Sequence, residues 1–240
     1  MSVYEYKIKL NISHVNKENT LSYAGLTSIL QEAASVHADC LGFGVNHVDK
    51  THLTWLLLSW KIEIFSTPKW NTEVTVKTWP REMARVYSYR DFEVYDEDSN
   101  LVAIASSKWV LINTEKHSIA RITPEITNRF NLENRCVFTN YTDLKLEEPE
   151  ISDFTFEYTT GRRDIDVNNH VNNLYYLDFA IESLPEEFYE NNFKNIEVIY
   201  KKEVKLGEKI KCFYSNLDNK HVVTIKNDDL SVVHAMIVLW

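Results

Sequence analysis

The chain has 240 residues with a formal net charge of −9, and 44% of its residues are hydrophobic. This composition suffices for a packed core, and five glycines and five prolines are too few for a disordered or linker-rich chain. The acidic balance offers no dominant positive field to hold phosphates. The sequence therefore predicts no nucleic-acid binding and no stable association with anionic membranes.

The chain carries no pattern typical of secretion, membrane insertion or a bound cofactor. Its first residues, MSVYEYKIKL, lack the layout of a signal peptide, and the most apolar run, LTWLLLSW, is too short to cross a bilayer. The three cysteines are widely spaced, with no CxxC pair. No GxSxG, P-loop or GxGxxG motif is present. We expect a reduced, cytoplasmic protein without a cofactor or a metal.

The first half of the chain has the pattern of a strand, a long helix and four further strands. Apolar residues alternate in VYEYKIKLNI, which is strand spacing. From Leu26 to Leu41 they recur at helical spacing, and Gly42 is placed to end that helix. The strands expected next are LTWLLLSWKIEIFS, TEVTVKTWPRE, RVYSYRDFEVYDEDSN and LVAIASSKWVLIN.

The second half has the same order of elements. FTFEYTT indicates a strand, and apolar residues from Leu174 to Leu184 indicate a helix that Pro185 helps to end. Strands are expected at NIEVIYKKEV, EKIKCFYS, KHVVTIKND and SVVHAMIVLW. The polar, acidic stretch 123–150 is interpreted as the connection. We predict an α+β fold, a tandem repeat in which each antiparallel sheet wraps around a helix.

Polar residues crowd the segment DIDVNNHVNNLYYLDF, directly before the second predicted helix. Asp166, Asn168 and His170 alternate, so in an extended segment their side chains would project to one side. His170 can transfer a proton near neutral pH, and Asn168 can orient a water. Asp166 can attack directly or act on a water. The pattern is typical of acid–base chemistry next to a helix start.

The start of that helix also offers backbone N–H groups and the positive end of the helix dipole. A carbonyl that becomes negative at oxygen when it is attacked needs such donors. The expected donors are the backbone groups of Val171, Asn172 and Asn173. The alternative is that Asn172 or Asn173 only caps the helix.

The order of these segments closely resembles the acyl–acyl carrier protein thioesterases of plant plastids and bacteria, over nearly the whole chain. The resemblance rests on SILQEAASVHADCLGFG, LTWLLLSWKIEIFSTPKWNTEVTVKTW and ASSKWVLINTEKHSIARITPEI, and then on DVNNHVNNLYYLDFAIES and YKKEVKLGEK. It implies a double hotdog fold. The N-terminal hotdog, 1–130, would bind the acyl chain without a catalytic set. A connecting segment, 131–150, would lead to a catalytic C-terminal hotdog, 151–240.

The resemblance also implies an activity, namely hydrolysis of fatty acyl–acyl carrier protein to free fatty acid in fatty acid biosynthesis. The catalytic Asp-x-Asn-x-His of the family falls on Asp166, Asn168 and His170. Its catalytic glutamate falls on Glu203 of YKKEV, which we expect on a neighbouring strand. Val204 stands where many plant members have cysteine. This difference favours a carboxylate-and-water mechanism over a cysteine nucleophile.

The first half is expected to have lost the catalytic set. Aligning the two halves places Asn19, Leu21 and Tyr23 opposite the three motif residues. The resemblance implies that this half houses the acyl chain instead. The expected slot is formed by one face of the strand LTWLLLSW and by the helix face above it. Its residues are Trp55, Leu56, Leu57, Leu58, Ile29, Leu30 and Ala33.

Acyl carrier protein is the expected partner. It is acidic, so an acidic enzyme needs a local basic patch to dock it. The basic residues nearest the motif are Arg162, Arg163, Lys201, Lys202 and Lys205, although a merely solvated face is the alternative.

Three other activities remain open from the sequence. They are an acyl-CoA thioesterase on the same fold, a hotdog dehydratase or hydratase, and an acyl-binding module without catalysis. The sequence also leaves open whether the protein is a homodimer.

Overall fold

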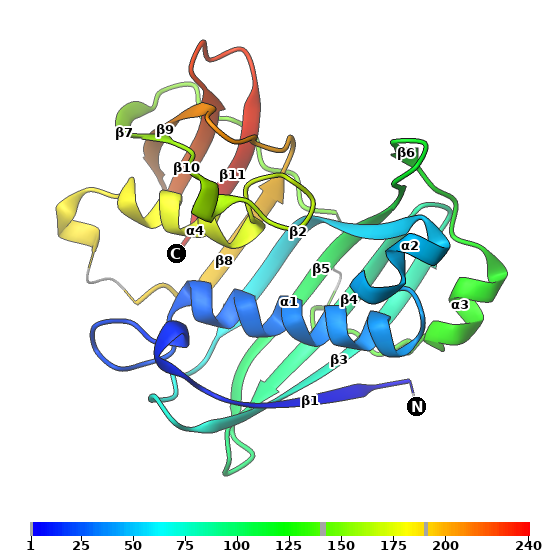
Figure 1. The fold of residues 1–240 in the computed structure, drawn as a ribbon. Helices are drawn as coiled ribbons and strands as arrows, with labels where there is room; N and C mark the ends of the chain where they lie inside the picture. Colours follow the sequence, from blue (N-terminus) through cyan, green and yellow to red (C-terminus); the bar gives the residue numbers. More distant parts are fainter. Residues whose placement is uncertain (1, 140–142, 190–191) are drawn as a thin grey trace. The chain divides into compact units, whose positions relative to one another are not determined.

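The computed structural model describes residues 2–139, 143–189 and 192–240 (Figure 1). The chain forms two compact units. The N-terminal unit contains Met1–Leu58 and Ile62–Thr142, and the C-terminal unit contains Ser59–Lys61 and Asp143–Trp240. Each unit combines an antiparallel sheet with helices, which confirms the predicted α+β class.

The sheet of the N-terminal unit has the strand order β1-β3-β4-β5-β2, and β6 pairs with β5. Burial alternates along β1, where every second side chain is exposed. The elements are β1 (Tyr4–Lys9), α1 (Tyr23–Cys40), α2 (Val48–Thr51), β2 (Leu53–Ile64), β3 (Glu73–Ala84), β4 (Tyr87–Tyr95), β5 (Leu101–Asn113), β6 (Ser118–Ile119) and α3 (Pro124–Phe130), with short 3-10 turns η1 (Ile12–His14) and η2 (Val45–His47).

Helix α1 ends where the sequence pattern predicts, but it begins at Tyr23, three residues before the pattern starts. The Ser22 hydroxyl accepts a hydrogen bond from the Gly25 N–H at 2.9 Å, which caps the first turn. The helix packs its apolar face against β1 and β3, and Leu30 within that face is fully buried. Directly after the helix, Gly42 adopts a φ of 85°, a left-handed conformation that ends helices and favours glycine.

The sheet of the C-terminal unit has the order β8-β11-β10-β9-β7. When the strands are counted within each unit, both sheets have the same order, first-third-fourth-fifth-second, so the predicted repeat is confirmed. Helix α4 has ten residues and α1 has 18, so the two helices differ in length. The elements are β7 (Asp153–Thr159), η3 (Arg162–Asp164), α4 (Asn173–Glu182), η4 (Glu186–Phe188), β8 (Asn195–Tyr200), β9 (Lys209–Leu217), β10 (Lys220–Asn227) and β11 (Val233–Leu239).

The stretch interpreted as the connection begins with a helix. Thr123 caps α3, and Pro124 occupies its first turn, where a missing N–H costs nothing. Ile126 and Phe130 are buried in a cluster with Phe43 of the same unit. These two apolar side chains make residues 124–130 part of the N-terminal core rather than of a linker. Among the described helices, none is long and apolar enough to span a membrane.

Candidate active site

The motif residues lie in a tight turn between η3 and α4, not in the extended segment that their alternation suggested. The Asp166 N–H donates to the His170 carbonyl at 2.8 Å, and the Asn169 N–H donates to the Asp166 carbonyl at 3.1 Å. Asn169 has a φ of 62°, which asparagine tolerates better than most residues. A bridge between Ile165 and Val171 closes the turn. The chain reverses here, so contacts within the turn decide where each side chain points.

The carboxylate of Asp166 organises this turn. Its Oδ1 accepts hydrogen bonds from the Asn168 N–H at 2.8 Å and from the His170 N–H at 3.5 Å. Its Oδ2 lies 3.4 Å from Nδ2 of Asn168. The imidazole of His170 is half-buried and forms no hydrogen bond with a described residue. The structure thus brings the three motif residues together and leaves the His170 ring available to a substrate or a water.

Glu203 lies in a loop, not on the neighbouring strand that we expected, because β8 ends at Tyr200. Two hydrogen bonds fix the loop beside the motif. The Val171 N–H donates to the Val204 carbonyl at 2.8 Å, and the Val204 N–H donates to the Tyr176 hydroxyl at 3.1 Å. Val204 is fully buried, whereas Glu203 is exposed. The residue after His170 is therefore tied directly to the residue after Glu203.

Acids of both the motif turn and the Glu203 loop affect the pKa of Tyr176. Burial raises the pKa of its phenol, and the negative charges of Glu203 and Asp166 raise it further. The hydroxyl therefore stays protonated and continues to donate or accept hydrogen bonds at neutral pH. The acids of both segments therefore disfavour loss of the proton from this buried hydroxyl group.

Of the three expected oxyanion donors, the structure leaves one available. The Val171 N–H is bonded to Val204, and the Asn172 N–H donates to the Asp164 carbonyl at 2.8 Å. Asn172 caps α4, since its side chain accepts from the Leu174 N–H at 3.1 Å. The Asn173 N–H, at the first position of the helix, donates to no described acceptor. The helix start can thus offer one backbone donor together with the helix dipole.

Asp164 has a structural role in the same turn. Its carboxylate is buried and accepts from the Tyr158 hydroxyl at 2.8 Å and from the Gly161 N–H at 2.7 Å. These bonds hold η3 against β7, so the acid before the motif stabilises the turn and is not exposed to a substrate.

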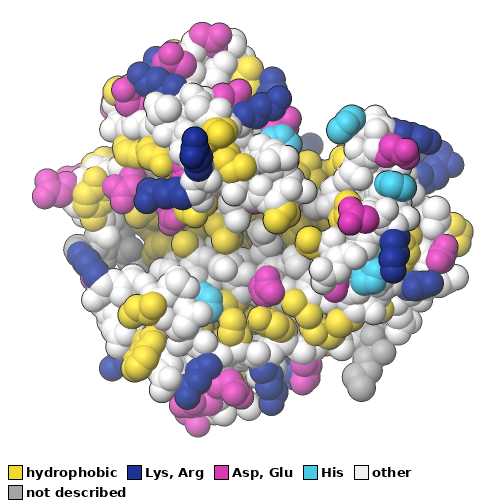
Figure 2. Space-filling model, viewed as in Figure 1, with side chains coloured by type: hydrophobic (Ala, Val, Ile, Leu, Met, Phe, Trp, Pro, Cys, Tyr) yellow, Lys and Arg dark blue, Asp and Glu magenta, His cyan; other side chains and the backbone are white. Residues whose placement is uncertain are grey.

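The five basic residues expected to dock the carrier are all exposed, namely Arg162, Arg163, Lys201, Lys202 and Lys205. Among them, Arg163 forms an ion pair with Asp164, with Nε 3.5 Å from Oδ1. Lys209 pairs with Glu157 at 2.9 Å, and Lys211 pairs with Asp228 at 2.7 Å. Figure 2 shows basic side chains interspersed with acidic ones over this unit. The basic residues around the turn and the Glu203 loop thus lie on a surface of mixed charge.

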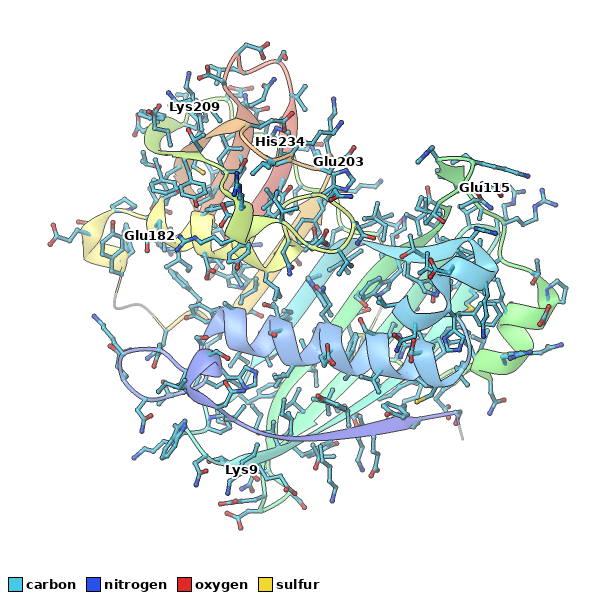
Figure 3. The ribbon with its side chains drawn as sticks, viewed as in Figure 1. Lys9, Glu115, Glu182, Glu203, Lys209 and His234 are labelled. Carbon is cyan, nitrogen blue, oxygen red and sulfur yellow. The ribbon has the colours of Figure 1, made fainter. Side chains whose placement is uncertain are left out.

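His234 supports the Glu203 loop and was not singled out from the sequence. Its Nδ1 lies 3.1 Å from the Lys202 carbonyl, and its own carbonyl accepts from the N–H groups of Lys201 and Lys202. Figure 3 shows His234 on β11 near Glu203, and both line a cavity of about 160 Å³. The signal in the sequence is a histidine within the otherwise apolar strand SVVHAMIVLW. A buried polar residue in such a strand needs a specific partner.

The N-terminal unit holds a cavity of about 70 Å³ beneath α1. Trp55, expected in the acyl slot, lines it, and so does its neighbour Thr54. Leu57 is 2% exposed and Leu56 is 39% exposed, so the two face different surroundings, as alternation on a strand requires. Ile29, Leu30 and Ala33 are buried in the core and do not line the cavity, and Leu58 is half-buried outside it. The helix contributes Ala34, Ser35 and Ala38 instead.

The turn of the motif recurs in the N-terminal unit, in a register that corrects our alignment. The Asn16 N–H donates to the Thr20 carbonyl at 2.9 Å, and Asn19 has a φ of 63°, matching Asn169. The residues at the places of Asp166, Asn168 and His170 are therefore Asn16, Glu18 and Thr20, not Asn19, Leu21 and Tyr23. The motif acid and base are absent from their places in this unit.

Comparison with known proteins identifies two domains of one family. The acyl-ACP thioesterase N-terminal domain matches residues 1–130, and the acyl-ACP thioesterase C-terminal domain matches residues 147–238. The chain is 28% identical over 217 residues to oleoyl-acyl carrier protein thioesterase 2, chloroplastic, of Arabidopsis thaliana, covering 83% of this chain and 59% of that protein. It is 24% identical over 218 residues to the chloroplastic dodecanoyl-[acyl-carrier-protein] hydrolase of Cinnamomum camphora, covering 84% of this chain and 56% of that protein. The chain thus spans less than two thirds of these curated relatives.

Solved structures share the fold over nearly the full chain. An acyl-ACP thioesterase from Bacteroides thetaiotaomicron superposes with a TM-score of 0.87 at 24% identity, covering 99% of this chain and 97% of that one. The 12:0-ACP thioesterase from Umbellularia californica gives 0.84 at 19% identity, covering 100% and 96%. These structures establish the tandem hotdog fold. Because both family domains match in order and together cover most of the sequence, the chain belongs to the acyl-ACP thioesterase family.

Proposed function

We propose that this protein hydrolyses the thioester of fatty acyl–acyl carrier protein and releases free fatty acid and carrier protein in fatty acid biosynthesis. The observation that carries the proposal is the turn at Asp166, which joins a carboxylate, an amide and an imidazole at the start of a helix. The family domains and the names of the curated relatives support acyl carrier protein as the leaving group.

In the proposed reaction, Asp166 acts as the general base. Two backbone N–H groups hold its Oδ1, so the carboxylate keeps one orientation while Oδ2 accepts a proton from a water. The water oxygen bonds to the thioester carbonyl carbon, and the carbonyl oxygen becomes an oxyanion. The amide of Asn168 orients the water, since it can donate and accept but cannot change charge.

The oxyanion is stabilised by the helix start and then collapses. The Asn173 N–H donates a hydrogen bond to the oxyanion, and the positive end of the α4 dipole stabilises its negative charge. Collapse breaks the carbon–sulfur bond, and His170, as the imidazolium, gives a proton to the departing thiolate. The proton held by Asp166 then passes through solvent to His170, which restores both groups. Glu203, presented by the loop that Val204 anchors, orients His170 or the water. Val204 offers no thiol, so no acyl-cysteine intermediate forms at that position.

The exposed basic residues support carrier protein as the partner. Arg162 and Arg163 precede the turn, while Lys202 and Lys205 flank Glu203. An acidic carrier approaching these cations would be guided by complementary charge, even though the whole chain carries −9. A carrier protein bound to these basic residues would bring its thioester close to the motif turn.

The deciding experiment compares thiol release from one acyl chain attached to carrier protein and to coenzyme A. We expect a higher kcat/KM with the carrier, and a loss of at least ~10²-fold in kcat for Asp166→Ala and for His170→Ala. A preference for coenzyme A would support the acyl-CoA thioesterase instead. Hydration of an enoyl thioester without thiol release would support a dehydratase or hydratase. Binding without any turnover would leave only an acyl-binding module.

A further inference from the structure

The N-terminal unit buries a positive charge that no acid among the described residues neutralises. Arg90 on β4 is 4% exposed. Its Nη1 donates to Nδ1 of His37 and to the Thr78 hydroxyl, both at 3.1 Å. Both acceptors are neutral: burial, together with the charge of Arg90, lowers the pKa of His37 to about 3. No described carboxylate forms an ion pair with the guanidinium.

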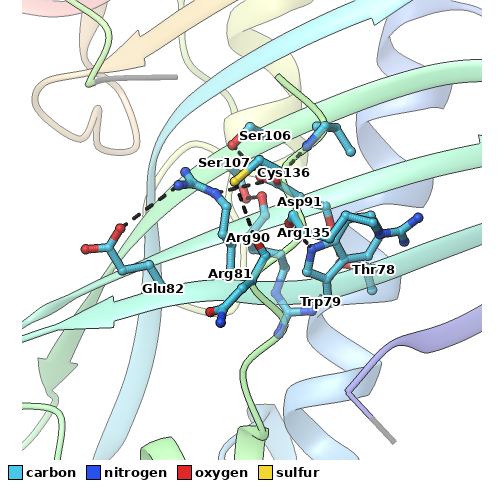
Figure 4. A network of polar contacts seen from close by, with 12 residues as sticks. Thr78, Trp79, Arg81, Glu82, Arg90, Asp91, Ser106, Ser107, Arg135 and Cys136 are labelled. Atoms are coloured by element: carbon cyan, nitrogen blue, oxygen red, sulfur yellow. Dashed lines mark hydrogen bonds and ion pairs between the residues drawn. The ribbon is translucent and has the colours of Figure 1, made fainter. Parts of the chain in front are cut away.

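The neighbouring acid, Asp91, does not serve as its partner. Successive residues of a strand point to opposite faces, and Asp91 faces away from α1. Its carboxylate accepts from the Ser106 hydroxyl at 2.7 Å and from the Val137 N–H at 3.0 Å (Figure 4). Arg81 lies 3.5 Å from it and forms its ion pair. The acid next in sequence is thus engaged on the other side of the sheet.

The guanidinium lies beside the cavity beneath α1. Arg90 lines this cavity together with Phe130, whose ring centroid is 5.9 Å from the guanidinium carbon. Both hydrogens of Nη1 are used by His37 and Thr78. The three N–H groups on Nη2 and Nε remain for another acceptor.

A second donor lies at the same cavity. The indole Nε1–H of Trp55 is buried and has no hydrogen-bond partner among the described residues. Trp55 packs edge-on against Phe130, with ring centroids 6.0 Å apart, so its ring is held in place. Much of the remaining wall is apolar, including Ala34, Ala38 and Met83. Two buried donor groups thus border one cavity, and a plain hydrocarbon chain could accept from neither.

We propose that this cavity recognises an oxygen carried by the acyl chain, a hydroxyl, oxo or carboxylate group, to which Arg90 and Trp55 donate. The inference rests on the proposed function only in taking the ligand to be a fatty acyl group. It makes Arg90 and Trp55 specificity-determining residues for oxygenated chains. The competing explanation is purely structural, with Arg90 only joining α1 to β3 through His37 and Thr78.

The test measures binding rather than turnover. Dissociation constants are measured by calorimetry for dodecanoate, for dodecanoates hydroxylated or oxidised to a ketone at successive carbons, and for dodecanedioate. We expect at least one oxygenated chain to bind roughly tenfold more tightly than dodecanoate, as a charge-assisted hydrogen bond allows. The chain that binds most tightly shows which of the three groups the cavity recognises, and at which carbon. Equal binding of all chains would overturn the proposal.

Two variants separate recognition from folding. Trp55→Phe keeps an aromatic ring but removes the N–H and part of the ring volume, so its readout is the ratio of the dissociation constants of dodecanoate and the oxygenated chain. This ratio should fall, whatever happens to the binding of dodecanoate itself. Arg90→Lys keeps the charge and loses the planar fork, and should abolish most of the advantage. If Arg90→Lys does not fold, Trp55→Phe alone decides: an unchanged advantage in that variant contradicts the role of the cavity.

The outcome is distinguishable from failure of the proposed function. If the protein binds oxygenated chains selectively but releases no thiol, this inference stands and the proposed hydrolase activity is wrong. If it hydrolyses acyl–carrier protein but shows no such selectivity, the hydrolase activity stands and this inference is wrong. Arg121→Lys, the same substitution at an exposed arginine of the same unit, serves as the matched control and should change neither quantity.

Discussion

Asp166 and Asn16 accept the same backbone hydrogen bond in the two units of the chain. The Asn168 N–H donates to Oδ1 of Asp166 at 2.8 Å, and the Glu18 N–H donates to Oδ1 of Asn16 at 3.1 Å. Both turns then lead into a capped helix. A neutral amide therefore suffices to hold this turn, so the negative charge at Asp166 is not required by the fold. This comparison favours chemistry over capping as the reason for an acid at that position.

Asp166→Asn should separate the two roles. We expect the free energy of unfolding to change by less than about 1 kcal/mol, because asparagine holds the equivalent turn in the other unit. We expect kcat to fall by at least ~10²-fold, because an amide cannot accept the proton from water. Urea unfolding and thiol release measure the two effects. Asn16→Asp is the matched control and should leave kcat unchanged. Near-normal activity of Asp166→Asn would mean that Asp166 stabilises the turn and is not the general base.

Thiol-blocking reagents should leave most activity intact. Cys212 is fully buried, and burial raises the pKa of its thiol to about 11, so little thiolate exists at neutral pH. Cys40 and Cys136 are exposed and should react first. Activity followed during alkylation, with the modified residues mapped by mass spectrometry, checks this. Rapid and complete inactivation that tracks modification of Cys212 would argue for a cysteine mechanism.

Charge reversal near Glu203 should weaken carrier docking. With Lys201, Lys202 and Lys205 changed to glutamate, KM for acyl–carrier protein should rise and its dependence on salt should weaken, since fewer ion pairs remain to be screened. Small acyl thioesters should be hydrolysed as before.

The matched control reverses Lys9, Lys50 and Lys116, three exposed lysines of the N-terminal unit. It changes the net charge equally and should affect KM much less. If both triple variants raise KM alike, net charge rather than a docking patch explains the effect.

Chain-length preference should respond to Trp55 and not to Leu56. Trp55 lines the cavity beneath α1, so Trp55→Ala enlarges it and should move the product profile toward longer chains. Each further methylene buried contributes about 0.8 kcal/mol, or roughly fourfold in affinity. Leu56→Ala is the control, since 39% of Leu56 is exposed. An unchanged product profile for folded Trp55→Ala would mean that the cavity does not determine the chain-length preference.

His37 should make the N-terminal unit sensitive to acid. Burial lowers the pKa of folded His37 to about 3, and an unfolded histidine titrates near 6.5. Between these values the unfolded chain binds more protons, so stability present above about pH 6.5 is lost as the pH falls, by at most ~1.4 kcal/mol per pH unit. His37→Gln should flatten the loss of stability between neutral pH and pH of about 5. Urea midpoints measure it, with exposed His117→Gln as the control. Equal losses in the parent and His37→Gln would contradict this assignment.

Hydrophobic periodicity predicted most of the elements. Strand β5 occupies the whole of LVAIASSKWVLIN, and α1 covers the helical pattern that Gly42 ends. Periodicity is a local property, because the alternation of a strand and the spacing of a helix face are written into neighbouring residues. The short helix α3 was missed because its two buried side chains, Ile126 and Phe130, are too few to show a period.

The register between the two units was not available from periodicity. Both halves have similar patterns, and a shift of three residues preserves the polar character of the segment before the helix. Only the hydrogen bonds of the turn, with Asn19 and Asn169 both at positive φ, fix Asn16 opposite Asp166. The apolar slot raised the same difficulty, because helical spacing marks a buried face without telling which part of it borders a cavity.

The sequence by itself determined the class of fold, the repeat and the residue types of the motif, since these depend on local spacing and composition. The tertiary structure decided that the motif lies in a turn, that the Val171 and Asn172 N–H groups are already bonded, and that Glu203 lies in a loop tied to the motif through Val204. It also decided that Arg90 is buried beside a cavity and forms no ion pair with a described acid. Hydrogen bonds and burial between residues distant in sequence depend on how the chain is packed, and no local pattern records them.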